Sequence, residues 1–535
     1  MKYINNKISW LLIVAIVFAL IINSCKEDEE LGSADRLFRP VINETSYGGT
    51  WIRLVWDKYA SANSYDLQLS IDSFITLVSE VSTDTTFYQF NELEYDTDYL
   101  IRIKSIGESL ESKYFINDII RTSDYPTKLN SISDITDTEV KVTWEEASYD
   151  SLLVMRDDTV DVSHIVTDAE NAKKEAIITG LLSDTAYVVR AYAGGKYQGK
   201  KSFSTSAPQV FEGEIIDLRS YSVEESYALL NQDFFDNLAL TYPNGVTVIL
   251  AGGTSYELDG PTVSSPFNLI TGYSVRGDAI IEVKGNFDVD GSAVIDKISL
   301  EGISFTDHPD KPKTDGNYGG TYLFNISNSG ASIDSVIIED CDIRYKRGIM
   351  RIKTGAAVKA ISINNCFIDS ISGYGVVNLD NGGVITNSIS VTNSTIAHTE
   401  LFLRSDKMDQ DLQNLTISNI TTYYTPKDYF FRMGNISEVE ITNCLFGAVW
   451  DSEGGAEGLS SGDITTSKIQ DNYRTSDCVW TPVVDESGAV TGEKNPIEST
   501  QMSESSEDVF TDPSSSNYSL MDSDLANRIG DPRWW

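Results

Sequence analysis

Histidine is scarce in this chain of 535 residues: there are three, at positions 164, 308 and 398. A metal site built from several histidines is therefore not expected. Basic residues are also few, with 41 lysines and arginines against 80 aspartates and glutamates, a formal net charge of −39. So acidic a chain is a poor partner for nucleic acids and for anionic membranes. Net charge does not exclude an acidic polysaccharide, because a local basic patch can still bind one.

The chain has one long apolar run, residues 10–22, and no second run that could span a membrane. Thirteen residues are too few for a transmembrane helix and suit the core of a signal peptide. The run ends in Ile22-Asn23-Ser24-Cys25, which resembles a bacterial lipobox. That resemblance implies a signal peptide over residues 1–24, lipidation of Cys25 and a membrane anchor made by lipid chains alone. An ordinary signal peptide with an accidental cysteine is the alternative.

An acidic tether, residues 25–36, follows the apolar run. Its Lys-Glu-Asp-Glu-Glu stretch, residues 26–30, resembles the acidic export signal of surface lipoproteins in the Bacteroidota. The resemblance implies an outer-membrane lipoprotein exposed at the cell surface.

The length suggests about three domains, and the first two are predicted over residues 37–123 and 124–207. Both show short alternating strands, with Trp56 or Trp144 on an early strand and Tyr99 or Tyr187 on a late one. This pattern resembles fibronectin type III modules, in which such a tyrosine forms the tyrosine corner. No catalytic constellation is apparent, so the aromatic residues are assigned to the cores and the modules to a spacer role.

Residues 210–535 contain a repeat of short β-rich segments. Six of them align on an apolar residue with successive spacings of 38, 25, 28, 26 and 24. A period near 25 indicates one solenoid coil per repeat. The residue two positions later tolerates a left-handed turn in every segment. The apolar anchors are Leu300, Ile338, Ile363, Val391, Ile417 and Ile441, and the turn residues are Gly302, Asp340, Asn365, Asn393, Asn419 and Asn443.

The turn column resembles the asparagine ladder of right-handed parallel β-helices of the pectate-lyase-like superfamily. The first spacing, 38, requires an inserted loop, predicted at residues 307–320. A helical apolar pattern before the repeat predicts a cap for the open end of the solenoid. The C-terminal tail resembles the closing segment of uncharacterised β-helix surface lipoproteins. The predicted fold class is therefore all-β, with two sandwiches followed by a right-handed parallel β-helix.

Cysteine is rare, with four residues besides Cys25. Three of these four occupy one inward column of the repeat, which predicts buried free thiols. A disulfide between Cys341 and Cys366 remains the alternative. The four are Cys341, Cys366, Cys444 and Cys478.

The second strand of each coil carries one polar position between two apolar ones. Because side chains alternate along a strand, the apolar neighbours are predicted in the core and the polar column outside. The column two positions earlier is then also predicted outside, which would place Phe402 and Phe430 on the surface. We call the polar set the arginine column: Asn325, Arg351, Asn378, Arg404 and Arg432.

The arginine column and the two phenylalanines form the candidate glycan-binding site. Guanidinium groups suit carboxylates and hydroxyls, and aromatic faces suit sugar rings. A uronate-containing glycan is the expected ligand. In the competing interpretation another segment covers this face and the arginines pair with acids such as Asp380, Asp406 or Asp428.

A polysaccharide lyase is the enzymatic alternative. It needs a base for the C5 proton, for which Arg404, Arg432 or Lys407 are candidates, and a cation to neutralise the carboxylate. Calcium prefers oxygen ligands, which Asp380, Asp406 and Asp409 supply. The arginine-rich motifs of pectate lyases and the paired aspartates of polygalacturonases are not found. The sequence therefore predicts a surface lipoprotein that binds polysaccharide for a glycan-uptake system, with an outer-membrane transporter as partner; an adhesion role is the third possibility.

Overall fold

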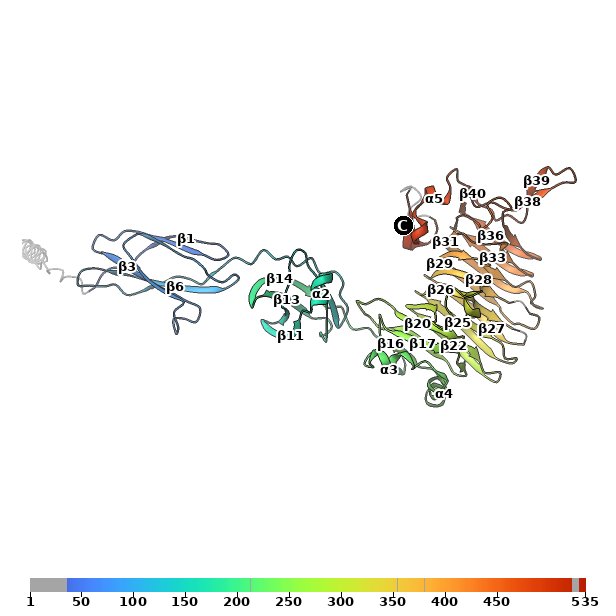
Figure 1. Cartoon of the computed structure of the whole chain (residues 1–535), viewed down its shortest axis with the longest axis horizontal. Coiled ribbons are helices and arrows are strands. Elements are labelled where there is room, and N and C mark those ends of the chain that lie inside the picture. Colours follow the sequence, from blue (N-terminus) through green and yellow to red (C-terminus); the bar gives the residue numbers. More distant parts are fainter. Residues whose placement is uncertain (1–35, 212, 354, 380, 522–528) are drawn as a thin grey trace, which may run out of the picture. The chain divides into compact units, whose positions relative to one another are not determined.

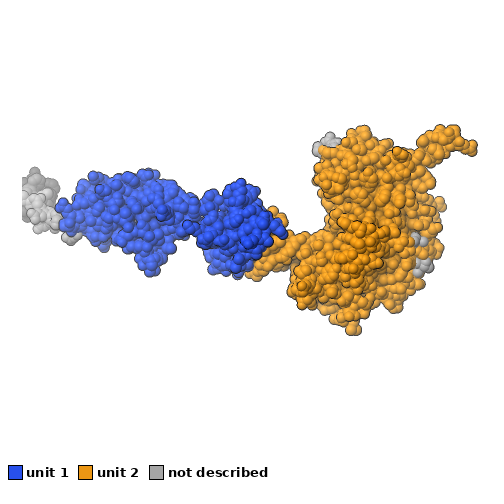
Figure 2. Space-filling view, viewed as in Figure 1, with its two compact units in different colours: residues 1–132, 142–176, 186–203 blue, residues 133–141, 177–185, 204–535 orange. Residues whose placement is uncertain are grey.

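The computed structural model describes residues 36–211, 213–353, 355–379, 381–521 and 529–535 (Figure 1). The predicted signal peptide, Cys25 and the tether up to residue 35 lie outside the described residues, as does Asp380. Within the described part, none of the helices has the length and apolar character needed to cross a bilayer. Two compact units are distinguished in Figure 2.

The first sandwich consists of two antiparallel sheets around Trp56 and Tyr65, whose rings lie 5.2 Å apart. The Glu94 N–H donates to the Tyr99 hydroxyl at 3.0 Å, the backbone contact expected of a tyrosine corner. One sheet contains β1 (Ile42–Tyr47), β2 (Ile52–Trp56) and β5 (Phe87–Phe90); the other contains β4 (Ser79–Thr83), β3 (Ser64–Ser70), β6 (Asp98–Ile106), β7 (Phe115–Ile116) and β8 (Ile120–Arg121).

The second sandwich has the same two-layer plan and one short helix, α2 (Asp168–Lys173). Trp144 is buried against Tyr149, with 5.4 Å between the rings, and the Tyr187 hydroxyl donates to Asp161 at 2.9 Å. The strands are β9 (Glu139–Thr143) with β12 (Glu175–Thr179), and β11 (Thr159–Ile165), β10 (Ser151–Arg156), β13 (Ala186–Ala193) and β14 (Lys196–Ser204). The sandwich part of the predicted fold class is confirmed.

The remaining strands, apart from two antiparallel pairs within residues 482–520, stack in parallel as a β-solenoid. Its first coils are β15 (Ile215–Asp217), β16 (Thr247–Leu250), β17 (Ser255–Asp259), β18 (Thr262–Val263), β19 (Phe267–Thr271), β20 (Ala279–Gly285) and β21 (Asp288–Val289). Two helices, α3 (Val223–Tyr227) and α4 (Gln232–Thr241), lie against this end, where Phe235 contacts Phe267 at 5.3 Å and Phe287 at 5.6 Å.

The central coils contain the predicted repeat, and the partners match residue by residue. Leu300 pairs with Ile338, Ile338 with Ile363, and Ile363 with Val391, and the series continues through Ile417 to Ile441. It extends beyond the aligned segments to Leu269 and Ile469. Strands carrying this first column are β22 (Val294–Glu301), β25 (Ser332–Glu339), β27 (Ala357–Asn364), β29 (Ser388–Thr399), β31 (Leu412–Tyr423), β33 (Ile436–Thr442) and β36 (Ile464–Gln470).

Further strands follow each turn. They are β23 (Ile303–Asp307), β24 (Tyr322–Ile326), β26 (Asp342–Ile352), β28 (Phe367–Asn378), β30 (Leu403–Arg404), β32 (Tyr429–Arg432), β34 (Leu445–Phe446), β35 (Glu457–Ser460), β37 (Tyr473–Arg474) and β40 (Thr500–Gln501). The loop predicted at residues 307–320 is present and contains η1 (Tyr318–Gly320).

A C-terminal segment covers one column of the solenoid. It includes α5 (Ser506–Val509), β41 (Phe510–Asp512), η2 (Pro513–Ser515), β42 (Asn517–Leu520) and η3 (Pro532–Trp534), after the hairpin β38 (Pro482–Val484) and β39 (Val490–Glu493). Asp531 is fully buried and accepts a hydrogen bond from Thr395 at 2.7 Å. Trp534 donates to the same Thr395 hydroxyl at 2.6 Å. This segment packs on the part of the coils that lies between the turn column and the arginine column.

The predicted turn column is confirmed. Each of its members has a positive φ, from 50° at Asn365 and Asn393 to 61° at Gly302, and Asp471 extends the column with 57°. Neighbouring asparagines also bond along the axis, since Asn419 donates its amide to the Asn393 side chain at 2.8 Å.

We expect Asn419→Ala to lower the free energy of unfolding by about 2 kcal/mol, because alanine disfavours the left-handed region and the amide bond is lost. Urea unfolding measures this change. The matched control is Asn414→Ala on β31, where the side chain is exposed; an equal loss in both variants would contradict the role of the turn.

The four cysteines of the described residues are free and buried, so the predicted thiols are confirmed and the Cys341–Cys366 disulfide is absent. Burial raises the pKa of Cys444 to about 12 and that of Cys341 well above its ordinary value. Thiols of this kind are poor nucleophiles at neutral pH and serve as packing residues.

Candidate functional site

The arginine column is in register. Asn325 pairs with Arg351, Arg351 with Asn378, Asn378 with Arg404, and Arg404 with Arg432. The residues on either side of the column are buried, as alternation predicts, so Arg351, Arg404 and Arg432 lie on the outer surface. Arg432 is more exposed than Arg404: 47% of the Arg432 side chain is exposed, against 24% for Arg404.

Asn378 departs from its column, because it is 2% exposed. The prediction that its side chain lies on the surface is therefore wrong. Its amide oxygen and that of Asn325 are buried without a hydrogen-bond partner among the described residues. Both amides flank Arg351, so the middle of the column contains polar groups that gain from a water or hydroxyl neighbour.

The predicted surface position of Phe402 and Phe430 is wrong, since both side chains are fully buried. Phe402 contacts Phe431 at 5.0 Å and Phe430 contacts Trp480 at 5.6 Å. Their column lies at a corner of the coil, where two consecutive residues point inward. The hydrogen-bond ladder is irregular there: the Val376 N–H lies 3.3 Å from the Leu401 oxygen and 3.0 Å from the Phe402 oxygen. Strand alternation does not extend through such a bend.

Two tyrosines, Tyr374 and Tyr429, make the aromatic contacts with the arginine column that were predicted for Phe402 and Phe430. Tyr374 lies against two arginines, with the Arg351 guanidinium carbon 4.3 Å and that of Arg347 4.6 Å from its ring centroid. Arg432 lies 5.5 Å from the ring of Tyr429. Guanidinium groups held against aromatic faces are favourable and fixed in orientation. The sequence carries this signal as Tyr374, which directly precedes Gly375.

Asp406 links two members of the arginine column. Its oxygens lie 2.7 Å from Arg404 Nε and 3.0 Å from Arg432 Nε. This is the pairing that the competing interpretation expected for Arg404 and Arg432. Arg432 meets Asp406 through its Nε, and a guanidinium has five N–H donors, so this pairing orients Arg432 without using all its donors.

A corner that precedes the arginine column in each of four coils has a residue in the left-handed region, and three of these four residues are large. Tyr345, Ser370, His398 and Tyr424 have φ of 57°, 59°, 45° and 45°. Such values are uncommon for large side chains, and strained residues cluster at functional sites. We call these four residues the corner column. Sequence reasoning missed it, although its spacings of 25, 28 and 26 repeat those of the turn column.

The corner column carries aromatic side chains beside a buried acid, Asp369. His398 stacks on Tyr424 at 5.9 Å, and its Nδ1 lies 2.9 Å from an oxygen of Asp369. Tyr424 is 43% and Trp450 41% exposed. The ring of Tyr318, from the inserted loop, lies 6.0 Å from that of Tyr345.

The remaining candidates do not gather into one site. Lys407 and Asp409 are exposed, and Asp409 accepts a hydrogen bond from the Gly383 N–H at 2.7 Å. Asp406 faces its two arginines, and Asp380 lies outside the described residues. Over the described ranges, no group of three or more histidines, cysteines, aspartates or glutamates could hold a metal ion.

Comparison with known proteins gives one family match. Residues 255–399 match the model of a domain of unknown function, DUF4957, which is less than half of the chain. No curated protein matches the sequence.

Solved structures resemble the sandwich part. A two-domain fibronectin type III segment of chicken tenascin is 21% identical, covering 31% of this chain and 98% of that one, with a TM-score of 0.19. The FN1–FN3 domains of chicken CNTN1 are 13% identical over 33% of this chain and 69% of that one, with a TM-score of 0.16. The central fibronectin III array of a RIM-binding protein is 17% identical over 34% and 66%, with a TM-score of 0.14.

Proposed function

We propose that the protein is a cell-surface lipoprotein whose β-solenoid binds an extended, carboxylate-bearing polysaccharide for a glycan-uptake system. The observation that carries this proposal is the in-register arginine column, with Tyr374 and Tyr429 against its guanidinium groups. The anchor rests on the lipobox-like sequence before Cys25, and an outer-membrane glycan transporter is the partner such a protein would serve.

The geometry favours an elongated ligand. Successive coils lie about 4.8 Å apart, so Arg351 and Arg404, two coils apart, are separated by about 10 Å along the axis. A ligand that meets both, and Arg432 on the next coil, must run along the solenoid. Arginine forks bind carboxylates through two N–H groups, and tyrosine faces add contact area. A uronate polymer has this combination of repeated carboxylates and ring faces.

A lyase of the pectate-lyase-like superfamily is the second candidate function. Arg404 and Arg432 suit the role of base poorly, because both are held by Asp406. The observation that favours a lyase is the pair of His398 and Asp369 on the corner column. A carboxylate that orients an imidazole is an arrangement used for proton abstraction.

The experiment that separates the two functions is electrophoresis of the mature chain in gels containing pectin, polygalacturonate, alginate or neutral glycans, run beside an ultraviolet assay of the same mixtures. We expect retardation on the uronates, unchanged by a chelator, and no increase in absorbance from unsaturated ends. Absorbance that grows on a uronate and disappears with His398→Ala would make the protein a lyase. If no glycan retards the chain and no absorbance develops, both functions are contradicted.

A further inference from the structure

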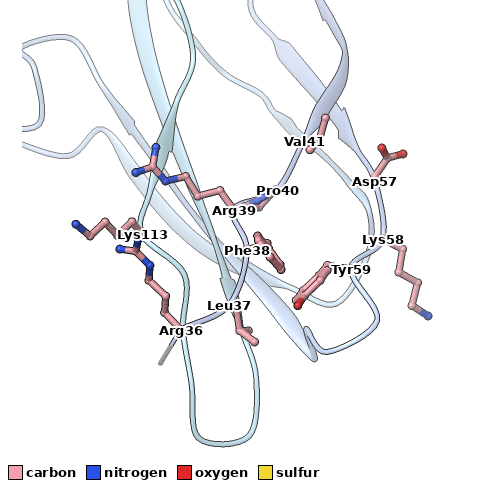
Figure 3. Close-up of a pocket in the computed structure, with 10 residues that line it drawn as sticks. All are labelled: Arg36, Leu37, Phe38, Arg39, Pro40, Val41, Asp57, Lys58, Tyr59 and Lys113. Atoms are coloured by element: carbon pink, nitrogen blue, oxygen red, sulfur yellow. The ribbon is translucent and has the colours of Figure 1, made fainter. Parts of the chain in front are cut away.

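A second candidate binding surface lies on the first sandwich, far in sequence from the arginine column. It is a hollow of about 860 Å³ where the chain enters the first strand, shown in Figure 3. We call it the entry hollow; its lining residues are Arg36, Leu37, Phe38, Arg39, Pro40, Val41, Asp57, Lys58, Tyr59 and Lys113.

The entry hollow is basic in a chain that is otherwise acidic. Four of its lining residues are cations and one, Asp57, is an acid, whereas the whole chain has 41 bases and 80 acids. Asp57 already accepts a hydrogen bond from the Asn43 amide at 2.6 Å. In the described part of the chain no ion pair within 4.0 Å involves Arg36, Arg39, Lys58 or Lys113. Their charges are left for an anionic partner.

Apolar side chains are exposed beside these cations. Phe38 is 70% and Val41 60% exposed, although both lie at the start of a folded sandwich. The Phe38 ring meets Tyr59 edge to face at 5.7 Å. Arg36 and Lys113 line the same hollow, as Figure 3 shows. Cations around an exposed aromatic and aliphatic pair are the composition of surfaces that rest on anionic lipid headgroups.

The short sequence distance between the entry hollow and Cys25 indicates the membrane as the partner. Cys25 lies eleven residues before Arg36 in the sequence, so the intervening chain spans at most about 40 Å. We propose that the entry hollow rests on the phosphate-bearing headgroups of the membrane that holds the lipid chains of Cys25. This inference rests on the lipidation included in the proposed function, and it assigns the first sandwich a contact rather than a spacer role alone.

The net charge of −39 does not oppose such a contact at short range. Charges farther from the membrane than about 8 Å are largely screened at physiological salt, so the headgroups meet the local cations first. The acidic residues at positions 27–30 could bind to the same cations in place of the membrane. The test distinguishes these two partners.

The test is sedimentation of the mature chain carrying Cys25→Ser, which has no lipid, with vesicles of phosphatidylcholine alone or mixed with phosphatidylglycerol. We expect binding to the mixed vesicles, weaker as salt increases, and about tenfold or more weaker binding for the triple variant Arg36→Gln, Arg39→Gln, Lys113→Gln. The matched control removes three cations from the second sandwich, Lys173→Gln, Lys196→Gln and Lys201→Gln, and should bind as the parent does.

Several results would overturn the proposal. These are equal binding to both vesicle types, equal loss in the control, or no binding to either vesicle. Binding that appears only after residues 26–35 are deleted would identify the acidic tether as the occupant. Binding of inorganic phosphate or polygalacturonate through the same three cations, without vesicles, would identify a soluble anion. Glycan retardation that persists in the triple variant is due to the solenoid and keeps the proposed function distinct, and a mass measurement of Cys25 tests lipidation separately.

Discussion

Phe430→Ala is expected to lower the free energy of unfolding of the solenoid by about 4 kcal/mol. The ring is fully buried and contacts Phe446 at 5.0 Å and Trp480 at 5.6 Å. Truncation of a buried phenylalanine removes its transfer free energy and leaves a cavity that a stack of coils cannot easily close, which typically costs 3–5 kcal/mol. Urea unfolding followed by tryptophan fluorescence measures the loss, since Trp480 lies against the new cavity.

The neighbouring residue supplies the control for Phe430. Tyr429 precedes it on β32 but faces Arg432 rather than the core. We expect Tyr429→Ala to cost about 1 kcal/mol or less in stability and to weaken glycan retardation instead. If Phe430→Ala were as stable as the wild type, the inward corner described above would be incorrect.

Lys346→Met is expected to change how stability depends on pH. The lysine is fully buried, with its Nζ donating to the Thr306 oxygen at 2.5 Å. Burial lowers the pKa of Lys346 from 10.5 to about 7, and Asp307 opposes the shift. Between these two values the unfolded chain binds a proton that the folded chain does not, so stability rises with pH over that range. Below pH 7 both states are protonated and the penalty is constant.

The penalty corresponds to a pKa difference of about 3.5, or on the order of 5 kcal/mol. Methionine removes it but also removes the bond to Thr306, so we expect Lys346→Met to be about 2 kcal/mol more stable at pH 7. That advantage should decline and reverse by pH 10. Unfolding of both proteins from pH 6 to 10 measures the difference, in which other titrating groups cancel. Lys359→Met, exposed and paired with Asp334, is the control; a pH-independent difference for Lys346→Met would contradict the account.

The repeating parts of the fold could be predicted from the sequence because each coil places the same position in the same environment. The apolar anchors, the left-handed turns and the inward cysteines all recur near a period of 25, and each is observed where the alignment put it. The two sandwiches were recognisable from a buried tryptophan and a late tyrosine. The contact of Asp531 with Thr395 could not be predicted in this way, because it joins positions 136 residues apart that are not related by the repeat.

The candidate site was only partly predictable. The outward arginines follow from alternation, which holds along the straight part of a strand. Phe402 and Phe430 were misplaced because alternation was continued through a corner, where backbone angles rather than sequence spacing decide which side chain turns inward. Tyr374 was missed for the same reason. The corner column was visible as a period, but its tyrosines and His398 are not residues that favour a left-handed turn.

The most direct test of the account is the affinity of the mature chain for polygalacturonate, measured with the double variant Arg351→Ala, Arg432→Ala. The control removes two exposed cations from the first strands of the coils, Lys359→Ala and Lys468→Ala, which pair with Asp334 and Glu440. We expect affinity to fall about tenfold or more in the arginine variant, because two charge-assisted contacts are lost, and to remain unchanged in the control. Equal affinity in the wild type and the arginine variant would show that the arginine column is not the glycan-binding surface.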